Sequence, residues 1–118
     1  MGLDQYAYAT THGPGKWSAK HQLCTWRKHA ALQGWMDRKY EEKNDTYEEF
    51  NCKRLYLDNW DLDELENAIV NRLLPDTEGF FFGNRNESDF FRERDINFIR
   101  KARHHLNAGD KVYYYAWY

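Results

Sequence analysis

The segment Lys111-Val-Tyr-Tyr-Tyr-Ala-Trp-Tyr118 predicts a β-strand that carries aromatic side chains on both of its faces. Successive side chains of a strand point to opposite sides, so every second residue shares a face. One side of this segment carries Val112, Tyr114, Ala116 and Tyr118. The other side carries Tyr113, Tyr115 and Trp117. Because aromatic residues make up 18% of the chain, we expect a core built largely from Phe, Tyr and Trp rings.

Two helices are predicted before this strand. The nearer one runs from about Asp89 to Asn107, and Gly109 lies just past its end. Its apolar face consists of Phe91, Phe98, Ala102 and Leu106. The earlier helix has Asp61 as its N-cap and ends at Pro75, which cannot continue an α-helix. Its apolar stripe consists of Leu62, Leu65, Ile69 and Leu73.

The run Phe80-Phe-Phe82 lies between Gly79 and Gly83, and is too short for a helix and too apolar for an open loop. We expect it to form a buried strand or a tight crossing segment. Three further elements are predicted in the N-terminal half: a strand over Leu3–Thr10, a helix over Leu23–Lys43 and a strand over Cys52–Leu57. The helix is favoured because Ala, Leu, Met, Glu, Lys and Arg dominate that stretch, which contains no proline.

The predicted elements follow the order β-α-β-α-β-α-β. We therefore expect an α+β fold in which about three helices pack on a small, mainly antiparallel sheet. A chain of 118 residues has the usual size of one domain, so a single domain over residues 1–118 is expected. The mean hydropathy is −1.01, yet the aromatic content argues against disorder, because disordered chains are depleted in aromatic residues.

The charged residues of the sequence do not predict a strong electrostatic field of one sign around the protein. The net charge is −2, from 17 basic and 19 acidic residues dispersed along the sequence, which does not predict attraction to nucleic acid or to an anionic membrane. No window approaches the ~20 apolar residues of a spanning helix, and Met1–Tyr6 lacks the features of a signal peptide. Cys24 and Cys52 are the only cysteines, which favours two free thiols in a reducing compartment and leaves a single bridge between them as the alternative. We expect a cytoplasmic protein with no membrane contact.

Two motifs suggest a kinship. The first is Trp26-Arg-Lys28 with Leu32 and Trp35, and the second is Leu73-Leu-Pro-Asp-Thr-Glu-Gly-Phe-Phe-Phe-Gly83. Together with Met1-Gly-Leu-Asp4, Phe91 and Asp95-Ile96, they resemble a family of small, functionally uncharacterised proteins of bacteriophages, including marine phages, and of bacteria. This chain has Gln33 where similar sequences tend to carry His. The resemblance implies a phage context and no particular activity.

Catalytic and metal chemistry find little support in the sequence. His104 and His105 are adjacent and project about 100° apart on a helix, and His21 and His29 are eight residues apart, so neither pair predicts a shared ion. Cys24 has His21 and Lys28 nearby, but a buried thiol is the commoner use of cysteine. No nucleophile elbow, P-loop or dinucleotide fingerprint is present. We expect no catalytic residue, no metal and no cofactor.

A binding surface is predicted where the two motifs meet. Its residues are Trp26, Arg27, Lys28, Trp35, Asp76, Thr77, Gly79 and Asp95. On the predicted first helix, Trp26 and Trp35 project about 180° apart, so one belongs to the core and the other borders the surface. Arg27 and Lys28 form either a solvated flank or a set of donors for a carboxylate such as Asp95, and a structural ion pair is favoured over a ligand contact.

The expected function is that of a non-catalytic accessory protein that binds a host or phage protein, because Tyr, Trp and Arg anchor protein interfaces. One alternative is a nucleic-acid-binding module that uses the basic residues of the first and last predicted helices. A sequence pI near 6.2 makes a nucleic-acid partner the less favoured of the two. The other alternative is a small enzyme or ligand-binding domain with a pocket near the turn Asp76–Gly83.

Overall fold

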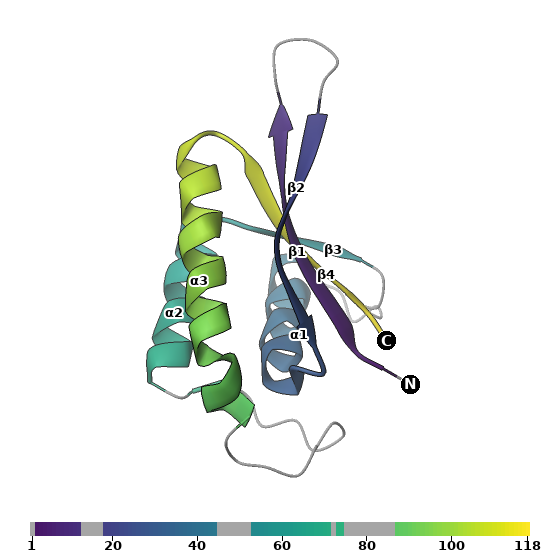
Figure 1. Cartoon of the computed structure of the whole chain (residues 1–118), viewed down its shortest axis with the longest axis vertical. Helices are drawn as coiled ribbons and strands as arrows, with labels where there is room; N and C mark the ends of the chain where they lie inside the picture. The colour runs from purple at the N-terminus through teal and green to yellow at the C-terminus, as the bar shows by residue number, and fades with distance from the viewer. Residues whose placement is uncertain (1, 13–17, 45–52, 72, 75–86) are drawn as a thin grey trace.

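A computed structural model describes residues 2–12, 18–44, 53–71, 73–74 and 87–118 (Figure 1). Within these residues, three helices pack on a four-stranded antiparallel sheet, which confirms the predicted α+β fold. The strands are β1 (Asp4–His12), β2 (Ser18–Arg27), β3 (Arg54–Leu57) and β4 (Lys111–Trp117). The helices are α1 (Ala30–Asn44), α2 (Asn59–Val70) and α3 (Glu87–Asn107). The predicted strand at Phe80–Phe82 lies outside the described residues.

The two ends of the chain form the middle of the sheet. The strand order is β2-β1-β4-β3, and each neighbouring pair is antiparallel. The register places Asp4 of β1 beside Trp117 of β4, so the N- and C-terminal segments lie side by side (Figure 1). The terminal strand predicted from alternation is therefore confirmed, and it occupies a central position between β1 and β3.

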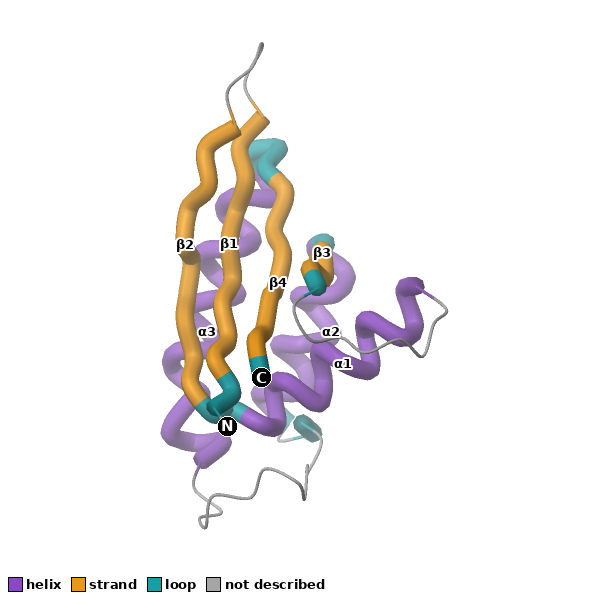
Figure 2. The backbone as a smooth tube through the Cα atoms, turned by 90° about the vertical axis from the view of Figure 1, so that its right-hand side faces the viewer, coloured by secondary structure: helices purple, strands orange, loops and turns teal. Residues whose placement is uncertain are grey.

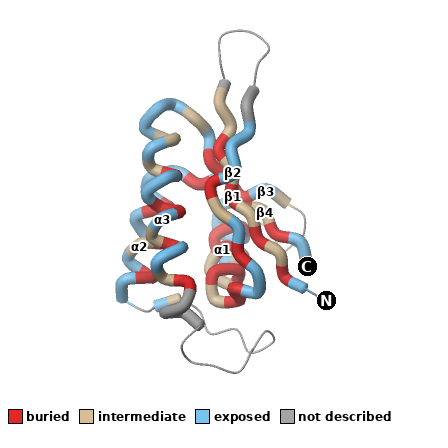
Figure 3. Tube along the Cα trace, in the orientation of Figure 1, coloured by how far each residue is buried: buried red, intermediate tan, exposed pale blue. Residues whose placement is uncertain are grey.

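All three helices lie on one side of the sheet (Figure 2). Burial alternates along the strands as this arrangement requires: Gln5, Ala7 and Ala9 of β1 are buried, as is Leu3 just before it, while the residues between them are only partly covered (Figure 3). The predicted apolar face of α3 packs on the core: Phe91, Phe98 and Ala102 are buried, and Leu106 is partly buried. The core between sheet and helices also takes Leu62, Leu65 and Ile69 from α2.

The prediction that Leu23–Arg27 starts a helix is wrong. These residues form the end of β2, and α1 begins only at Ala30. Pairing with β1 decides the conformation, since Trp26 lies opposite Gln5 and Cys24 lies opposite Ala7. A register shift in β1–β2 between Ala7 and Tyr8 accommodates one extra residue on β2. Thr and Trp also favour extended backbone, so tertiary pairing and local preference agree here.

A left-handed residue joins β2 to α1. Lys28 has φ 60°, and its backbone N–H donates to the Leu3 carbonyl at 2.8 Å. The next residue, His29, is held by the side chain of Gln5, which accepts from the His29 N–H at 2.8 Å and donates to the His29 carbonyl at 3.0 Å. The Gln5 amide thus binds a backbone segment that has left the sheet, and this fixes where α1 starts.

The sequence pattern predicted Asp61 as the N-cap of α2, and this prediction is wrong, because the N-cap is Asp58. Asp58 accepts from the Asp61 N–H at 2.9 Å, and the Asp61 carboxylate accepts from the Asp58 N–H at 3.0 Å, which makes a capping box. The helix ends at Val70, five residues before Pro75. Leu73 is consequently not part of its apolar stripe and is exposed.

Candidate functional site

Two of the predicted site residues, Trp26 and Asp95, meet in the core. The indole N–H of Trp26 donates to Asp95 Oδ1 at 2.7 Å, and His29 Nε2 lies 2.8 Å from Asp95 Oδ2. Asp95 is 1% exposed and His29 is 2% exposed. The His29 ring stacks on Phe91 with ring centres 4.2 Å apart. This carboxylate is therefore closed off from solvent and has a partner on each oxygen.

A second set of buried polar groups adjoins it. Gln5 Nε2 donates to the Tyr114 hydroxyl at 2.8 Å, and that hydroxyl donates to Gln33 Oε1 at 2.6 Å. Burial raises the pKa of Tyr114 well above its ordinary value, so the phenol stays protonated. The described residues contain no buried side-chain nitrogen or oxygen without a hydrogen-bond partner. The network joins β1, β4, α1 and the β2–α1 junction, which is a structural role.

The other predicted site residues do not join this pair. Arg27 is exposed, and its Nε lies 3.9 Å from Asp4, so the expected Arg27–Asp95 ion pair is wrong. Lys28 is exposed in the β2–α1 junction, and Trp35 is half-buried on α1 with Lys39 Nζ 5.3 Å from its ring centre. Trp26 and Trp35 thus lie on different elements. The remaining three predicted residues, Asp76, Thr77 and Gly79, lie outside the described residues.

A set of accessible aromatic residues in the described part of the chain lies on the side of the sheet away from the helices. Strand register and alternation send side chains from β1, β3 and β4 to the side away from the helices. The rings on this side are Tyr6, Tyr8, Tyr56, Tyr113, Tyr115 and Trp117. No helix of the described part of the chain covers them (Figure 2). We call this surface the aromatic sheet face.

The rings of the aromatic sheet face form a connected layer. Tyr8 contacts Tyr113 with ring centres 5.4 Å apart, and Tyr113 contacts Tyr56 at 5.6 Å. Tyr6 and Tyr8 are stacked at 6.1 Å with their planes 14° apart. Tyr113 is only 2% exposed beneath its neighbours, whereas Tyr56 is 46% and Trp117 is 61% exposed. Tyr113 therefore supports the layer, and Tyr56 and Trp117 are open to a ligand.

Cations surround and partly cover these rings. Lys20 Nζ of β2 lies 4.0 Å from the Tyr8 ring centre, and the Arg54 guanidinium of β3 lies 4.8 Å from the Tyr113 ring centre. Lys111 occupies the same side of β4 as Tyr113, opposite Thr10 of β1. Among the described residues of this side the only carboxylate is Asp4, which lies beside Arg27. The surface is positive although the chain is acidic overall.

The sequence pattern carried part of this signal. Tyr113, Tyr115 and Trp117 were predicted to share one side of a strand, and the sheet confirms that they do. What alternation could not predict is that none of the described helices covers this side. The opposite side, with Val112, Tyr114 and Ala116, is no less apolar and is the one that contacts the helices.

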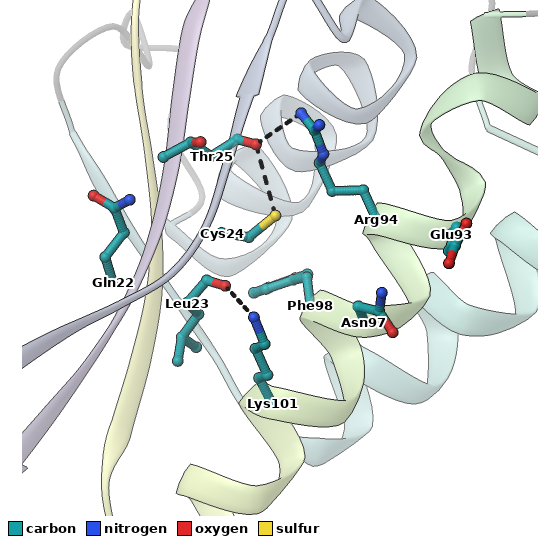
Figure 4. Close-up of a pocket in the computed structure, with 9 residues that line it drawn as sticks. All are labelled: Gln22, Leu23, Cys24, Thr25, Glu93, Arg94, Asn97, Phe98 and Lys101. Atoms are coloured by element: carbon teal, nitrogen blue, oxygen red, sulfur yellow. Dashed lines mark hydrogen bonds between the residues drawn. The ribbon is translucent and has the colours of Figure 1, made fainter.

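A groove separates β2 from α3 (Figure 4). Its volume is about 660 Å³, and residues from both elements line it, among them Cys24, Arg94 and Lys101. Burial raises the pKa of the Cys24 thiol to about 11, and the thiol lies 3.7 Å from the Thr25 carbonyl of its own strand. A neutral thiol in this position is a poor nucleophile, which argues against Cys24 catalysis.

Comparisons of the chain with models of protein families, with curated proteins and with solved structures find no significant match. Within the described residues, no helix is both long and apolar enough to cross a membrane. In the same residues, His, Cys, Asp and Glu form no cluster of three that could hold a metal ion. The aromatic sheet face is therefore the accessible feature from which function can be argued.

Proposed function

We propose that this protein is a non-catalytic binding protein whose aromatic sheet face holds single-stranded nucleic acid. The observation that carries the proposal is the combination, on one uncovered face, of open rings with cations that have few carboxylates near them. Unpaired bases stack on aromatic side chains, and each such contact is worth about 1–3 kcal/mol. Four-stranded sheets that bind single-stranded RNA use aromatic residues of their strands in this way.

The geometry supports stacking at more than one point. Tyr56 lies on the edge strand β3, Trp117 at the end of the central strand β4, and Tyr6 on β1. Neighbouring strands are about 4.8 Å apart, so open rings on different strands present separate platforms to successive bases. Lys20 and Lys111 flank Thr10 from the two strands that pair with β1, where phosphates of a strand crossing the sheet would meet them.

Charge favours nucleic acid over a protein partner. The interleaved charges of the sequence separate in space: Asp58, Asp61, Asp63, Glu64 and Glu66 belong to α2 and its cap, in the helical layer. Lys20, Arg54 and Lys111 face the other way. A single-stranded nucleic acid supplies one phosphate per nucleotide to such a face, and neutralising those phosphates contributes affinity through counterion release.

We also propose that the protein is related to the phage proteins that its two motifs resemble. A phage-type protein of this kind would meet single-stranded nucleic acid in the cytoplasm of the infected cell. A host or phage protein as the partner, which the sequence favoured, is the competing outcome of the same experiment.

Fluorescence anisotropy with a labelled oligonucleotide of about 12 nucleotides tests the proposal. We expect saturable binding to single strands that is weaker for the duplex and falls steeply with salt. Tyr56→Ala and Trp117→Ala are each expected to weaken binding about tenfold. Trp60→Ala is the matched control, because Trp60 is 72% exposed but belongs to α2. Equal affinity of all three variants, or no binding by the wild type, would reject the proposal and return the protein partner to first place.

A further inference from the structure

The groove between β2 and α3, part of which is drawn in Figure 4, is continued along the helix by a second hollow. The second hollow, of about 390 Å³, shares Gln22, Leu23 and Lys101 with the first, so the two adjoin. Arg94 and Lys101 are seven residues apart and therefore project from one side of α3. The last turn of the helix extends this side with His104 and His105.

The lining of this groove is strongly basic. The second hollow is lined by His21, Gln22, Leu23, Arg100, Lys101, His104 and His105, with no carboxylate among the described residues that border it. The first hollow has Arg94 and Lys101 against a single acid, Glu93. Cations that border a hollow and lack acidic neighbours attract anions from solution.

Arg103, another cation of α3, differs from the groove cations because carboxylates of α2 neutralise its charge. Arg103 faces α2, where its guanidinium pairs with Asp63 at 2.6 Å and with Glu66 at 2.7 Å. Within the described residues, neither Arg94, Arg100 nor Lys101 has a carboxylate within ion-pair distance. The charges of these three groove cations are thus not neutralised by a carboxylate of the described residues.

Hydrogen bonds hold the heads of two of these cations at the sheet edge. Lys101 Nζ donates to the Leu23 carbonyl at 3.4 Å, and Arg94 Nη1 donates to the Thr25 carbonyl at 3.3 Å (Figure 4). An ammonium has three donors and a guanidinium has five, so one long bond each leaves donors for a ligand in the groove. Contacts also hold two imidazoles of the groove in place. The His21 ring stacks on the His105 ring with ring centres 5.6 Å apart, and His105 Nδ1 lies 2.7 Å from Asp110 Oδ2.

We propose that this groove is a phosphate-binding site. Its ligand carries phosphate groups, either as a free anion such as pyrophosphate or as the phosphodiesters of a nucleic-acid strand. The second source rests on the proposed function. A nucleic acid bound to the aromatic sheet face could pass over the edge strand β2 and enter the groove that lies between β2 and α3. Arginine and lysine recognise phosphate through several charge-assisted hydrogen bonds, and imidazoles add donors when protonated.

Calorimetric titration of the full chain with pyrophosphate, at constant ionic strength and with acetate as the reference anion, tests the site. We expect saturable binding of pyrophosphate and none of acetate. Arg100→Gln is expected to weaken pyrophosphate binding about tenfold, the factor for one charge-assisted hydrogen bond. Lys101→Gln is expected to do the same, although it also removes the bond to Leu23, so Arg100→Gln carries the test if Lys101→Gln unfolds. Arg38→Gln, an exposed cation on α1, is the matched control.

The same variants separate this inference from the proposed function. If the groove takes the phosphodiesters of a strand bound to the sheet, Arg100→Gln also lowers the salt dependence of oligonucleotide binding by about one ion. If it takes a free anion, Arg100→Gln weakens pyrophosphate binding about tenfold while oligonucleotide binding stays unchanged. Pyrophosphate bound by a protein that ignores oligonucleotides would leave the groove site standing and reject the sheet proposal. Absence of pyrophosphate binding, with an oligonucleotide affinity that Arg100→Gln does not change, would overturn the groove site.

Discussion

The indole of Trp26 on β2 and the carboxylate of Asp95 on α3 are joined by a 2.7 Å hydrogen bond across 69 residues of sequence. His29 Nε2 lies 2.8 Å from the other carboxylate oxygen, Oδ2. Through one side chain, α3 is therefore tied both to the edge strand and to the first residues before α1. The bond is enclosed by aromatic rings, since Trp26 meets Phe98 edge to face with ring centres 5.2 Å apart. Burying a carboxylate is costly unless its oxygens are hydrogen-bonded, so both partners contribute to the stability of this cluster.

Replacing Asp95 by Ala should destabilise the fold by about 2–6 kcal/mol, because the Trp26 N–H and His29 both lose their buried acceptor and each unsatisfied buried group costs about 1–3 kcal/mol. Urea denaturation followed by tryptophan fluorescence measures the loss. Asp63→Ala serves as the control: its carboxylate is 66% exposed in a surface ion pair with Arg103, for which we expect less than about 1 kcal/mol. Equal effects of the two substitutions would show that the Asp95 cluster does not stabilise the core.

Replacing Tyr114 by Phe should cost about 1–3 kcal/mol although it removes a single oxygen. The hydroxyl accepts from Gln5 and donates to Gln33, and its loss leaves both amides short of a partner in the core. Tyr56→Phe is the matched change on the exposed side of the sheet and should lie within about 0.5 kcal/mol of the wild type. A Tyr114→Phe protein as stable as Tyr56→Phe would contradict the role given to this network.

The capping box of α2 should make stability depend on acid pH. The Asp61 N–H, which donates to the Asp58 carboxylate, lowers the pKa of Asp58 below its ordinary value of 3.8. A depressed folded-state pKa means that the carboxylate stabilises the protein above the unfolded-state pKa and that this contribution is lost as the pH falls through the folded-state pKa. Asp58→Ala should therefore cost about 1 kcal/mol at pH 7 and much less near pH 2.

Chemical denaturation of both proteins across this pH range checks the cap prediction. Glu64 offers a parallel case, because the hydrogen bond from Lys39 at 2.5 Å lowers the pKa of Glu64. A difference between Asp58→Ala and wild type that stayed constant down to pH 2 would mean that the charge of Asp58 does not matter to the cap.

Alkylation of Cys24 should be slow in the folded protein. Burial raises the pKa of this thiol to about 11, so only about one thiol in a thousand is ionised at pH 8, and the thiolate is the reactive form. Iodoacetamide labelling quantified by mass spectrometry on the Cys24 peptide should speed up about tenfold per pH unit between pH 8 and pH 10. Urea should abolish the protection. Fast labelling of the folded chain at pH 8 would instead point to an activated thiol.

Several elements were predictable from the sequence because their signals are local. The alternation of Lys111–Tyr118 and the helical spacing of Phe91, Phe98 and Ala102 each depend only on residues within one element. Periodicity of this kind survives in any fold that buries one side of the element. The sequence also singled out Asp95 as a carboxylate with a side-chain partner. Its partners are Trp26 and His29, and not Arg27 as predicted.

The rest was decided by tertiary structure. Leu23–Arg27 is compatible with helix or strand by composition, and pairing with β1 makes it a strand, which separates Trp26 from Trp35. Both sides of β4 are aromatic, so hydrophobicity alone does not predict which side the helices cover. In the structure they cover the side of Tyr114, whose hydroxyl is hydrogen-bonded to Gln5 and Gln33. Cations dispersed along the sequence gather on the other side for a physical reason. Alternation in paired strands carries Lys20, Arg54 and Lys111 outward together, and only the sheet register brings them to one surface.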